Sequence, residues 1–274
     1  MIATQQEYRI FSNELQVQIM GCNGSAMEPF ITRDGQYMFF NNSGENDDDM
    51  NLHFARKIND FTFEYLGELT GANSEVLEGV PNMDSAGNFY FTTTRSYTTN
   101  LQSLYGGVFT GENITNVSSI DQNLTRNEPG FLNFDSEVSK DGNTLYFATG
   151  KFSVNNFPDE ADLFVANKQN GFFEVVAESD NLMKNLNSHL LEYAASISSD
   201  DLEIFFNRSN IQTFELTIWQ SKRTAKNLPF ETPIQIEAIS GIQTEGASIS
   251  DDGKNLYYHK KHNGIFGIFK VSRE

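Results

Sequence analysis

The segment ISDDGKNLYYHKK, residues 249–261, decides the fold because the chain repeats it. The segments ITRDGQYMFFNNS at 31–43 and VSKDGNTLYFATG at 138–150 have the same build. ISSDDLEIFFNRS at 197–209 keeps the frame, and NMDSAGNFYFTTT at 82–94 keeps the ending with a different turn. Each copy ends in an apolar residue followed by two aromatic ones. A pattern that returns at a period of this size predicts a repeat architecture.

The spacing of the copies predicts a closed ring. Their opening residues lie 51, 56, 59 and 52 residues apart, and the interval that wraps from the last copy to the first is 56. A linear array gives no reason for that wrap-around interval, whereas a ring of blades does. The sequence therefore predicts an all-β fold, a five-bladed β-propeller with four antiparallel strands per blade. A two-sheet sandwich is the alternative, but it predicts no five-fold period.

Each unit has the pattern of four strands. A first strand such as EPFIT leads through an Asp-Gly turn into the aromatic strand. The aromatic strand shows no alternation with polar residues, so both of its faces should be buried. Gly35, Gly142 and Gly253 in the turns are expected at positive φ. The last unit ends after its third strand, and the segment FSNELQVQI at 11–19 is expected to supply the fourth and close the ring.

The prediction is a single domain over residues 1–274. Its expected parts are blade 1 at about 28–70, blade 2 at about 78–121, blade 3 at about 132–180, blade 4 at about 192–240, and blade 5 at about 245–274 plus 8–20. The one segment with a helical pattern is 179–193, in a connection between blades three and four.

Composition narrows the classes of partner. The chain carries 37 acidic and 19 basic residues, a net charge of −18, which argues against nucleic acid and against anionic membrane surfaces. No run approaches the roughly 18 apolar residues that span a bilayer, so we expect no membrane insertion. The first residues show no secretory signal, which predicts a cytoplasmic protein unless a leader was removed. Cys22 is the single cysteine, and we expect a monomer without an intrachain disulfide.

The repeat resembles the TolB-type, WD-repeat-like propeller repeat. The shared pattern is Glu-Pro, an apolar residue, Ser or Thr, any residue, Asp-Gly and then Leu-Tyr-Phe, and EPFITRDGQYMFF at 28–40 and DLFVANK at 162–168 match it best. The resemblance implies a propeller that is often periplasmic or exported in bacteria and that acts by binding rather than catalysis. Blades two and four depart from it at the turn, with Ser85-Ala86-Gly87 and Asp200-Asp201, which leaves the geometry of those turns open.

Acidic residues lie just upstream of the repeat starts in all five units. They are Glu28, Glu78, Asp135, Glu137, Glu192 and Glu245. We expect them at roughly one height on one rim of the central funnel. There they would fasten the blades by accepting backbone N–H groups, bind a ligand or a structural cation such as Ca²⁺, or form a carboxylate pair for glycoside hydrolysis. Apart from that cation, no cofactor or metal is expected, and no residue is assigned as catalytic.

The first functional interpretation is a non-enzymatic binding or scaffold module of TolB-like type that presents the funnel rim to a protein or glycan. The alternative is a carbohydrate-active enzyme, a glycoside hydrolase-like propeller that uses the funnel carboxylates. The predicted inner strands carry no Trp and few aromatic rings that a sugar could stack on, which favours the binding module. His259 and His262 flank Lys260-Lys261, and we expect this small basic spot on the surface.

Overall fold

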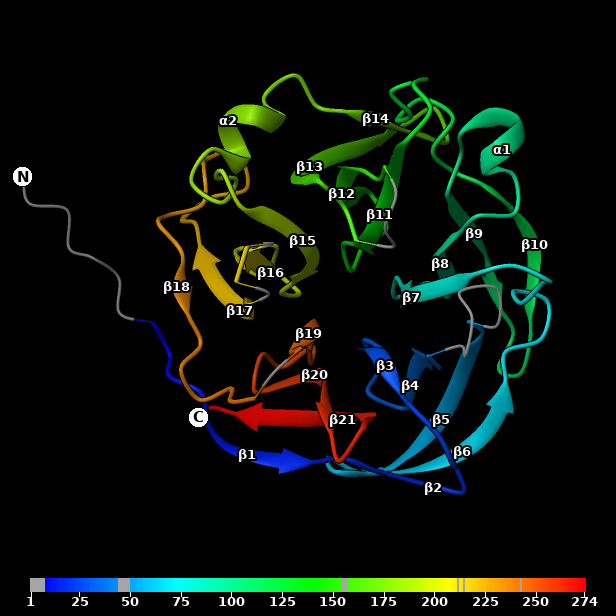
Figure 1. Cartoon of the computed structure of the whole chain (residues 1–274), viewed down its shortest axis with the longest axis vertical. Coiled ribbons are helices and arrows are strands. Elements are labelled where there is room, and N and C mark those ends of the chain that lie inside the picture. Colours follow the sequence, from blue (N-terminus) through cyan, green and yellow to red (C-terminus); the bar gives the residue numbers. More distant parts are fainter. Residues whose placement is uncertain (1–7, 44–49, 154–156, 211, 214, 242) are drawn as a thin grey trace, which may run out of the picture.

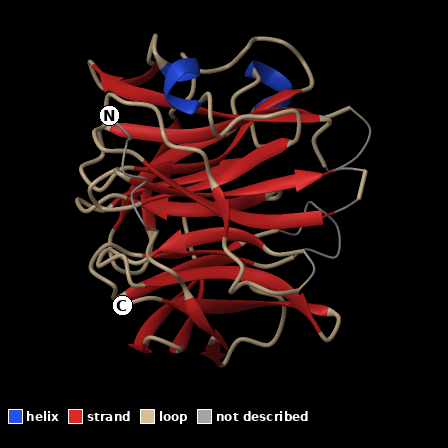
Figure 2. Cartoon of the chain, turned by 90° about the vertical axis from the view of Figure 1, so that its left-hand side faces the viewer, coloured by secondary structure: helices blue, strands red, loops and turns tan. Residues whose placement is uncertain are grey.

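Five β-sheets stand around a common axis in the computed structural model, which describes residues 8–43, 50–153, 157–210, 212–213, 215–241 and 243–274 (Figure 1). Each sheet contains one blade of four antiparallel strands, the sheet of blade 1 has one further strand, and the first strand of each blade lines the axis. The five-bladed propeller predicted from the repeat is confirmed. In the side view of Figure 2 the strands cross the molecule, and two short helices lie at its periphery.

The blades follow one another in chain order. Blade 1 contains β3 (Met27–Ile31), β4 (Tyr37–Asn41), β5 (Leu52–Asn59) and β6 (Thr62–Glu68). Blade 2 contains β7 (Glu78–Met83), β8 (Asn88–Thr93), β9 (Leu104–Phe109) and β10 (Ile114–Ser119). Blade 3 contains β11 (Phe131–Val138), β12 (Thr144–Lys151), β13 (Glu160–Gln169) and β14 (Phe172–Val175). Blade 4 contains β15 (Leu191–Ile197), β16 (Glu203–Asn210), β17 (Glu215–Lys222) and β18 (Ile234–Gln235). Blade 5 contains β19 (Glu245–Ile249), β20 (Asn255–His262), β21 (Ile265–Ser272) and β1 (Ser12–Gln16).

The N-terminal segment closes the ring as predicted, and it also adds a strand to blade 1. β1 pairs antiparallel with β21, with Ser12 opposite Ser272, and completes blade 5. The next strand, β2 (Gln18–Met20), pairs in parallel with β6 and so adds a fifth strand to blade 1. This second pairing was not predicted. The segment therefore hydrogen-bonds to the last blade and to the first, and spans the seam between them.

The aromatic strands form the packing between blades. The fifteen residues of the five apolar-aromatic triplets are all 3% exposed or less. They are Met38-Phe39-Phe40, Phe89-Tyr90-Phe91, Leu145-Tyr146-Phe147, Ile204-Phe205-Phe206 and Leu256-Tyr257-Tyr258. Phe39 of blade 1 meets Phe89 of blade 2 edge to face at 5.1 Å between ring centroids. Large rings on both faces fill the space between neighbouring sheets, which confirms the expected burial of both faces.

The repeated turn joins the first two strands of a blade through side chains. In blade 3 the Ser139 hydroxyl donates to Asp141 Oδ1 at 2.6 Å, and Asp141 accepts the Asn143 N–H at 3.0 Å. The glycine that follows has a positive φ in three blades, 68° at Gly35, 76° at Gly142 and 69° at Gly253, as predicted. Asp201 takes this place in blade 4 with φ 58°, because Asp tolerates the left-handed conformation better than most residues.

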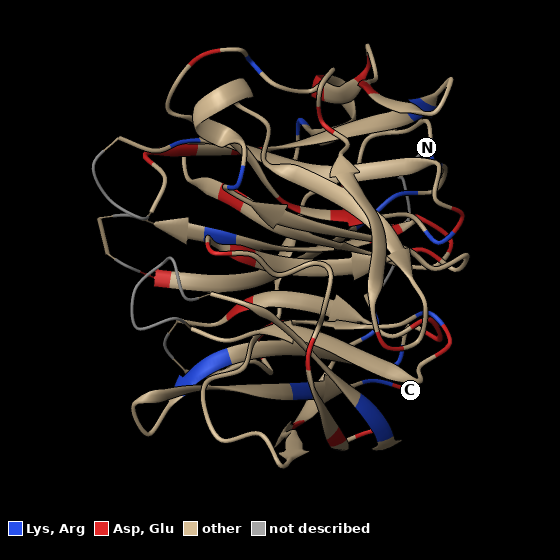
Figure 3. Cartoon of the chain, turned by 90° about the vertical axis from the view of Figure 1, so that its right-hand side faces the viewer, with Lys and Arg blue, Asp and Glu red and all other residues tan. Residues whose placement is uncertain are grey.

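Blade 2 builds its turn differently. Asp84 accepts the N–H groups of Ala86 and Asn88, both at 2.9 Å, and Gly87 has φ 88°. Figure 3 shows several Asp and Glu segments in the loops on the side where the C-terminus lies. The turn 250–255 is on this side, since Arg273 donates to the carbonyl of Gly253 at 2.6 Å. Some of the acidic side chains therefore stabilise the turns, because their carboxylates accept backbone N–H groups there.

Three details differ from the sequence prediction. The outer strand of blade 4 is only β18, where the pattern ETPIQIEAI suggested a longer strand. The helix expected within 179–193 is α2 (Ser179–Met183), one turn long. A second helix, α1 (Tyr97–Asn100), had no signal in the pattern. Among the described residues, no helix is long and apolar enough to cross a membrane.

Hydrogen bonds at one position of the inner strands join neighbouring blades. A side chain on one inner strand accepts a backbone N–H from the next. The backbone N–H of Val138 donates to the side chain of Asn82, that of Ile197 to Glu137, that of Ile249 to Ser196 and that of Ile31 to Ser248, at 3.0–3.1 Å. We call these four bonds the inner belt. Phe30 holds the corresponding position in blade 1 and has no acceptor, so the junction of blades 1 and 2 lacks this bond.

Candidate active site at the propeller axis

Every inner strand changes register at the same place. The pairing shifts between Met27 and Phe30 in blade 1, and at the corresponding place in the other four blades. The residue at each shift has a left-handed backbone: Glu28, Val80, Asp135, Ala194 and Gly246, with φ between 49° and 66°. Because Val and Ala adopt it as well, the conformation belongs to the β-bulge of the fold rather than to a ligand. These five residues are called the bulge residues below.

The bulge residues show that the six predicted acids do not share one height. Glu28 and Asp135 are bulge residues, Glu245 precedes its bulge residue by one, Glu78 and Glu192 by two, and Glu137 follows by two. Each residue advances a strand by roughly 3.3 Å. The expectation of a single ring of acids is therefore wrong, and the six acids fall into three groups.

Glu78 and Glu192 form the first group and bind the loops that lead into their own strands. Glu192 accepts the Ser188 N–H at 2.9 Å and the Ser188 hydroxyl at 2.6 Å, and pairs with Arg208 at 2.7 Å. Glu78 repeats this with Ser74 and Arg95, and both carboxylate side chains are fully buried. With these donors around them, the two acids have the contacts of structural residues, and the fastening role predicted for them remains a prediction for substitution to test.

Glu137 closes one end of the axis. It accepts the Ile197 N–H at 3.0 Å and pairs with Arg33 of blade 1 at 2.9 Å. Arg33 also donates to the carbonyls of Val138 at 3.0 Å and Ile197 at 3.3 Å, so one side chain ties blade 1 to blades 3 and 4. The axial cavity beside this pair has a volume of about 20 Å³. Glu28 and the bulge residues Val80, Ala194 and Gly246 also line this cavity. Its volume holds about one water molecule and excludes a sugar, so a sugar would have to bind outside it.

Glu28, Asp135 and Glu245 form the third group, together with Tyr193 and His259. The Glu28 N–H donates to His259 Nδ1 at 3.0 Å, which leaves the proton of a neutral imidazole on Nε2. His259 Nε2 lies 3.6 Å from Glu245 Oε2. The Tyr193 hydroxyl donates to Glu245 Oε1. We call these five side chains the axial cluster.

Burial and like charge keep protons on the axial cluster. Burial raises the pKa of Asp135 well above its ordinary value, and the charges of Glu28 and Glu245 raise it further. Burial also raises the pKa of Glu28, with Glu245 adding to the shift and His259 opposing it. The pKa of Tyr193 is raised well above its ordinary value by burial and by Glu245, so the phenol remains a donor. The side chain of Glu245 is 17% exposed, so solvent reaches it.

Two glycines make room for Glu28. A Cβ on Gly79 would lie 3.3 Å from Glu28 Oε2, and a Cβ on Gly246 would lie 2.9 Å from Glu28 Cα. Glu28 Oε2 is buried and has no hydrogen-bond partner within the described part of the chain. Such an unpaired buried oxygen is costly in a fold that only needs stability.

Tyr193 and His259 were missed in the sequence. His259 is fully buried and Lys260 is 7% exposed, whereas Lys261 and His262 are exposed, so the expected surface spot is wrong for two of its four residues. A signal in the sequence could have found His259, because it occupies the position that follows each aromatic pair. The residues at this position are Asn41, Thr92, Ala148, Asn207 and His259. Asn41 and Asn207 accept the N–H groups of Val80 and Gly246, as His259 does for Glu28. In the described part of the chain, no group of three or more His, Cys, Asp or Glu side chains is arranged to hold a metal ion.

No family model matches the chain, and no curated protein matches it in sequence. Among solved structures, a protein described as a glycoside hydrolase superposes with a TM-score of 0.64 at 11% identity, over 96% of this chain and 91% of that one. A family 117 glycoside hydrolase from the marine bacterium Zobellia galactanivorans gives 0.61 at 11% identity, over 96% and 91%. A protein assigned as TolB from Agrobacterium tumefaciens gives 0.51 at 14% identity, over 94% and 80%.

These similarities show a shared propeller fold, and they correct the first functional interpretation. The glycoside hydrolases superpose better than the TolB protein, so the fold no longer supports the preference for a non-enzymatic binding or scaffold module that was drawn from the TolB resemblance. The residues that suggested TolB are the turn and the buried aromatic strand. Those residues build blades, and a fold does not choose a function.

Proposed function

We propose that this protein is a carbohydrate-active enzyme that hydrolyses glycosidic bonds at the end of its axis where solvent reaches Glu245. The observation that carries the proposal is the axial cluster itself. Blades 1, 3 and 5 contribute Glu28, Asp135 and Glu245, whereas blades 2 and 4 place Val80 and Ala194 at their bulges. The inner belt fastens the blades without these three acids, and catalysis needs such an asymmetric set. Solved glycoside hydrolases share the fold, which makes it a suitable scaffold.

Asp135 fits the role of general acid. Its raised pKa favours the protonated carboxyl group, which can give its proton to the glycosidic oxygen as the bond to the anomeric carbon breaks. Glu28 supports this role through its like charge, which disfavours the ionised form of Asp135. Glu28 is therefore a positioning residue of the proposed site.

Glu245 fits the role of the second carboxylate. The Tyr193 hydroxyl orients it, His259 Nε2 faces its other oxygen, and solvent reaches the side chain. It either takes the proton of an attacking water or attacks the anomeric carbon itself, and the anomer of the released sugar distinguishes the two. Because Arg33 and Glu137 close the other end, the substrate approaches from the side of the cluster.

The test is reducing-sugar release from a panel of arabinan, xylan and galactan, followed by kinetics on the best substrate. Asp135→Asn and Glu245→Gln should each lower kcat by about 10²–10⁴, the usual contribution of an acid or base. Glu64→Gln changes an exposed carboxylate on β6 and should keep the parental kcat. Absence of sugar release by the parent, or parental kcat in both axial variants, would refute the proposal.

A further inference from the structure

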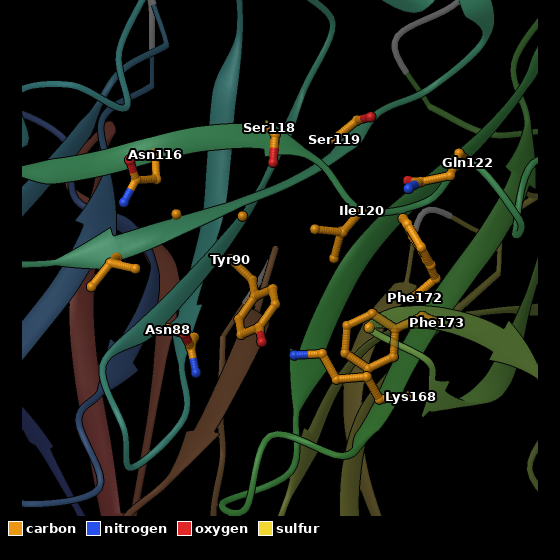
Figure 4. Close-up of a pocket in the computed structure, with 14 residues that line it drawn as sticks. Asn88, Tyr90, Asn116, Ser118, Ser119, Ile120, Gln122, Lys168, Phe172 and Phe173 are labelled. Carbon is orange, nitrogen blue, oxygen red and sulfur yellow. The ribbon is translucent and has the colours of Figure 1, made fainter.

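A groove of about 390 Å³ lies between blades 2 and 3, on the flank of the propeller (Figure 4). Strands β9 and β10 form one wall, and the β13–β14 hairpin forms the other. Its volume is in the range of small-molecule sites. The axial cluster does not line it, and the proposed hydrolysis makes no use of it.

The groove is positively charged although the chain is strongly acidic. Lys168 lines it and no Asp or Glu does, whereas the chain has 37 acidic and 19 basic residues. Lys168 Nζ lies 5.5 Å from the centroid of the Phe173 ring and forms no ion pair within the described residues. Figure 4 shows the Lys168 ammonium group and the Tyr90 hydroxyl turned toward the same part of the groove. Burial raises the pKa of Tyr90, so its hydroxyl stays a donor.

Neutral polar groups and an exposed ring complete the lining. The amide end of Gln122 is directed toward the groove, and its Oε1 is buried and has no hydrogen-bond partner in the described part of the chain. Phe172 is 48% exposed at the start of β14, beside Gln122 in Figure 4. An exposed aromatic face can cover the apolar face of a sugar ring, while amide and hydroxyl groups pair with sugar hydroxyls.

We propose that this groove is a second glycan-binding site that selects a sugar bearing a carboxylate, such as a uronic acid. Lys168 and the Tyr90 hydroxyl take the carboxylate, Gln122 pairs with ring hydroxyls, and Phe172 covers the ring. One ammonium group among neutral donors suits a singly charged carboxylate better than a phosphate, which arginine forks and helix N-termini bind more strongly. The site goes beyond the proposed hydrolysis, because it holds a glycan chain without bringing it to the axial acids.

Calorimetric titration with a galacturonic acid trisaccharide tests the site, with the neutral galactose trisaccharide as the matched probe. The parent should bind the acidic trisaccharide at least tenfold more tightly than the neutral one. Lys168→Ala should abolish that preference, and Phe172→Ala should weaken binding of the acidic trisaccharide at least fivefold. Lys184→Ala on the segment after α2 and Phe61→Ala, whose ring is also 48% exposed, are the matched controls and should bind as the parent does.

Glu245→Gln separates this site from the axis. It should leave the Kd for the acidic trisaccharide unchanged, since the groove makes no contact with the axial cluster. The proposal is overturned by an absence of saturable heat with the acidic trisaccharide, by equal binding of both probes, or by parental binding in Lys168→Ala. A Kd that responds to Glu245→Gln but not to Lys168→Ala would place the acidic sugar at the axis instead. None of these results depends on sugar release, so loss of the hydrolase proposal would leave the test intact.

Discussion

At the scale of single residues, Asp135 combines two properties that have different causes. Its left-handed backbone, φ 49°, comes from the bulge that all five inner strands share. Its raised pKa comes from burial and from two other acids that only some blades supply. Strain at Asp135 alone would suggest a functional residue, but Val80 and Ala194 carry the same strain without any chemistry. The charge environment is therefore the better indicator of function here.

The raised pKa of Asp135 predicts how stability depends on pH. The folded protein keeps a proton on Asp135 that the unfolded chain releases near the ordinary pKa of 3.8. The free energy of unfolding should therefore fall as pH rises from that value toward the raised pKa. Asp135→Asn cannot titrate, so its urea unfolding measured from pH 4 to 8 should show a flatter profile and a gain over the parent at the upper end. Glu64→Gln should keep the parental profile, and an equally steep profile in Asp135→Asn would contradict the assignment.

Gly142 tests the repeated turn. A Cβ there would lie 2.4 Å from Asp84 Oδ2, and Asp84 cannot move freely because Asn88 Nδ2 holds that oxygen at 2.6 Å. Gly171 also has a positive φ, 91°, but has open space around it. In urea denaturation, Gly171→Ala should cost about 1 kcal/mol for its backbone alone, and Gly142→Ala should cost clearly more. Equal costs would show that the Asp84 contact has no effect.

At the scale of strands, the sequence predicted well which segments form strands. It predicted poorly which residues of different strands lie at the same height along the axis. The aromatic triplets were found because burial on both faces leaves a compositional pattern that needs no knowledge of neighbours. The prediction placed Glu137 and Glu245 at one level although they precede the openings of their copies by one and four residues. The bulge falls at the same place in both strands and leaves that difference unchanged, so the error was to align the copies without counting offsets. Blade 2 illustrates the error: Met83, not Asn82, pairs as Ile31 does. Tyr193 meets Glu245 because blades 4 and 5 are neighbours, and His259 meets Glu28 because the closed ring brings blades 5 and 1 together.

The inner belt predicts the effect of Ser248→Ala. This change would leave the buried N–H of Ile31 without an acceptor at the junction of blades 5 and 1. An unpaired buried donor costs roughly 1–3 kcal/mol. Ser85 also makes one hydrogen bond, to the carbonyl of Lys140 at 2.7 Å, but is exposed, so water replaces it. Ser85→Ala should cost less than about 0.5 kcal/mol in the same chemical denaturation, and a similar loss in both variants would remove the belt as a source of stability.

At the scale of the whole molecule, the repeat interval was sufficient to predict the ring and the origin of its last strand. The parallel pairing of β2 with β6 was not predictable, because three residues carry no period of their own. Together the two pairings make the N-terminal segment a bridge across the seam. A propeller that loses this bridge exposes the outer edges of β21 and β6.

Deleting residues 1–20 should therefore lower the melting temperature by more than about 10 °C or cause aggregation. The deletion removes several kcal/mol of strand pairing, and each kcal/mol of lost stability lowers the melting temperature by about 2–4 °C in a domain of this size. Differential scanning calorimetry with light scattering measures both. Deleting residues 1–7 leaves β1 and β2 in place and is the control. A change of under about 2 °C on removing residues 1–20 would contradict closure by the N-terminal strand.

The bridge also sets an order for biosynthesis. Among the described strands of the propeller, β1 leaves the ribosome first and its partner β21 is made last. Blades 1 to 4 can pair internally while translation continues, but blade 5 must wait, and until then β1 is an unpaired strand tethered to a growing protein. Ring closure is thus a late step that joins distant parts of the chain, and such contacts form slowly. During that interval the nascent chain is open to pairing with other strands, so a cell that makes this protein rapidly should depend on chaperones to obtain it folded.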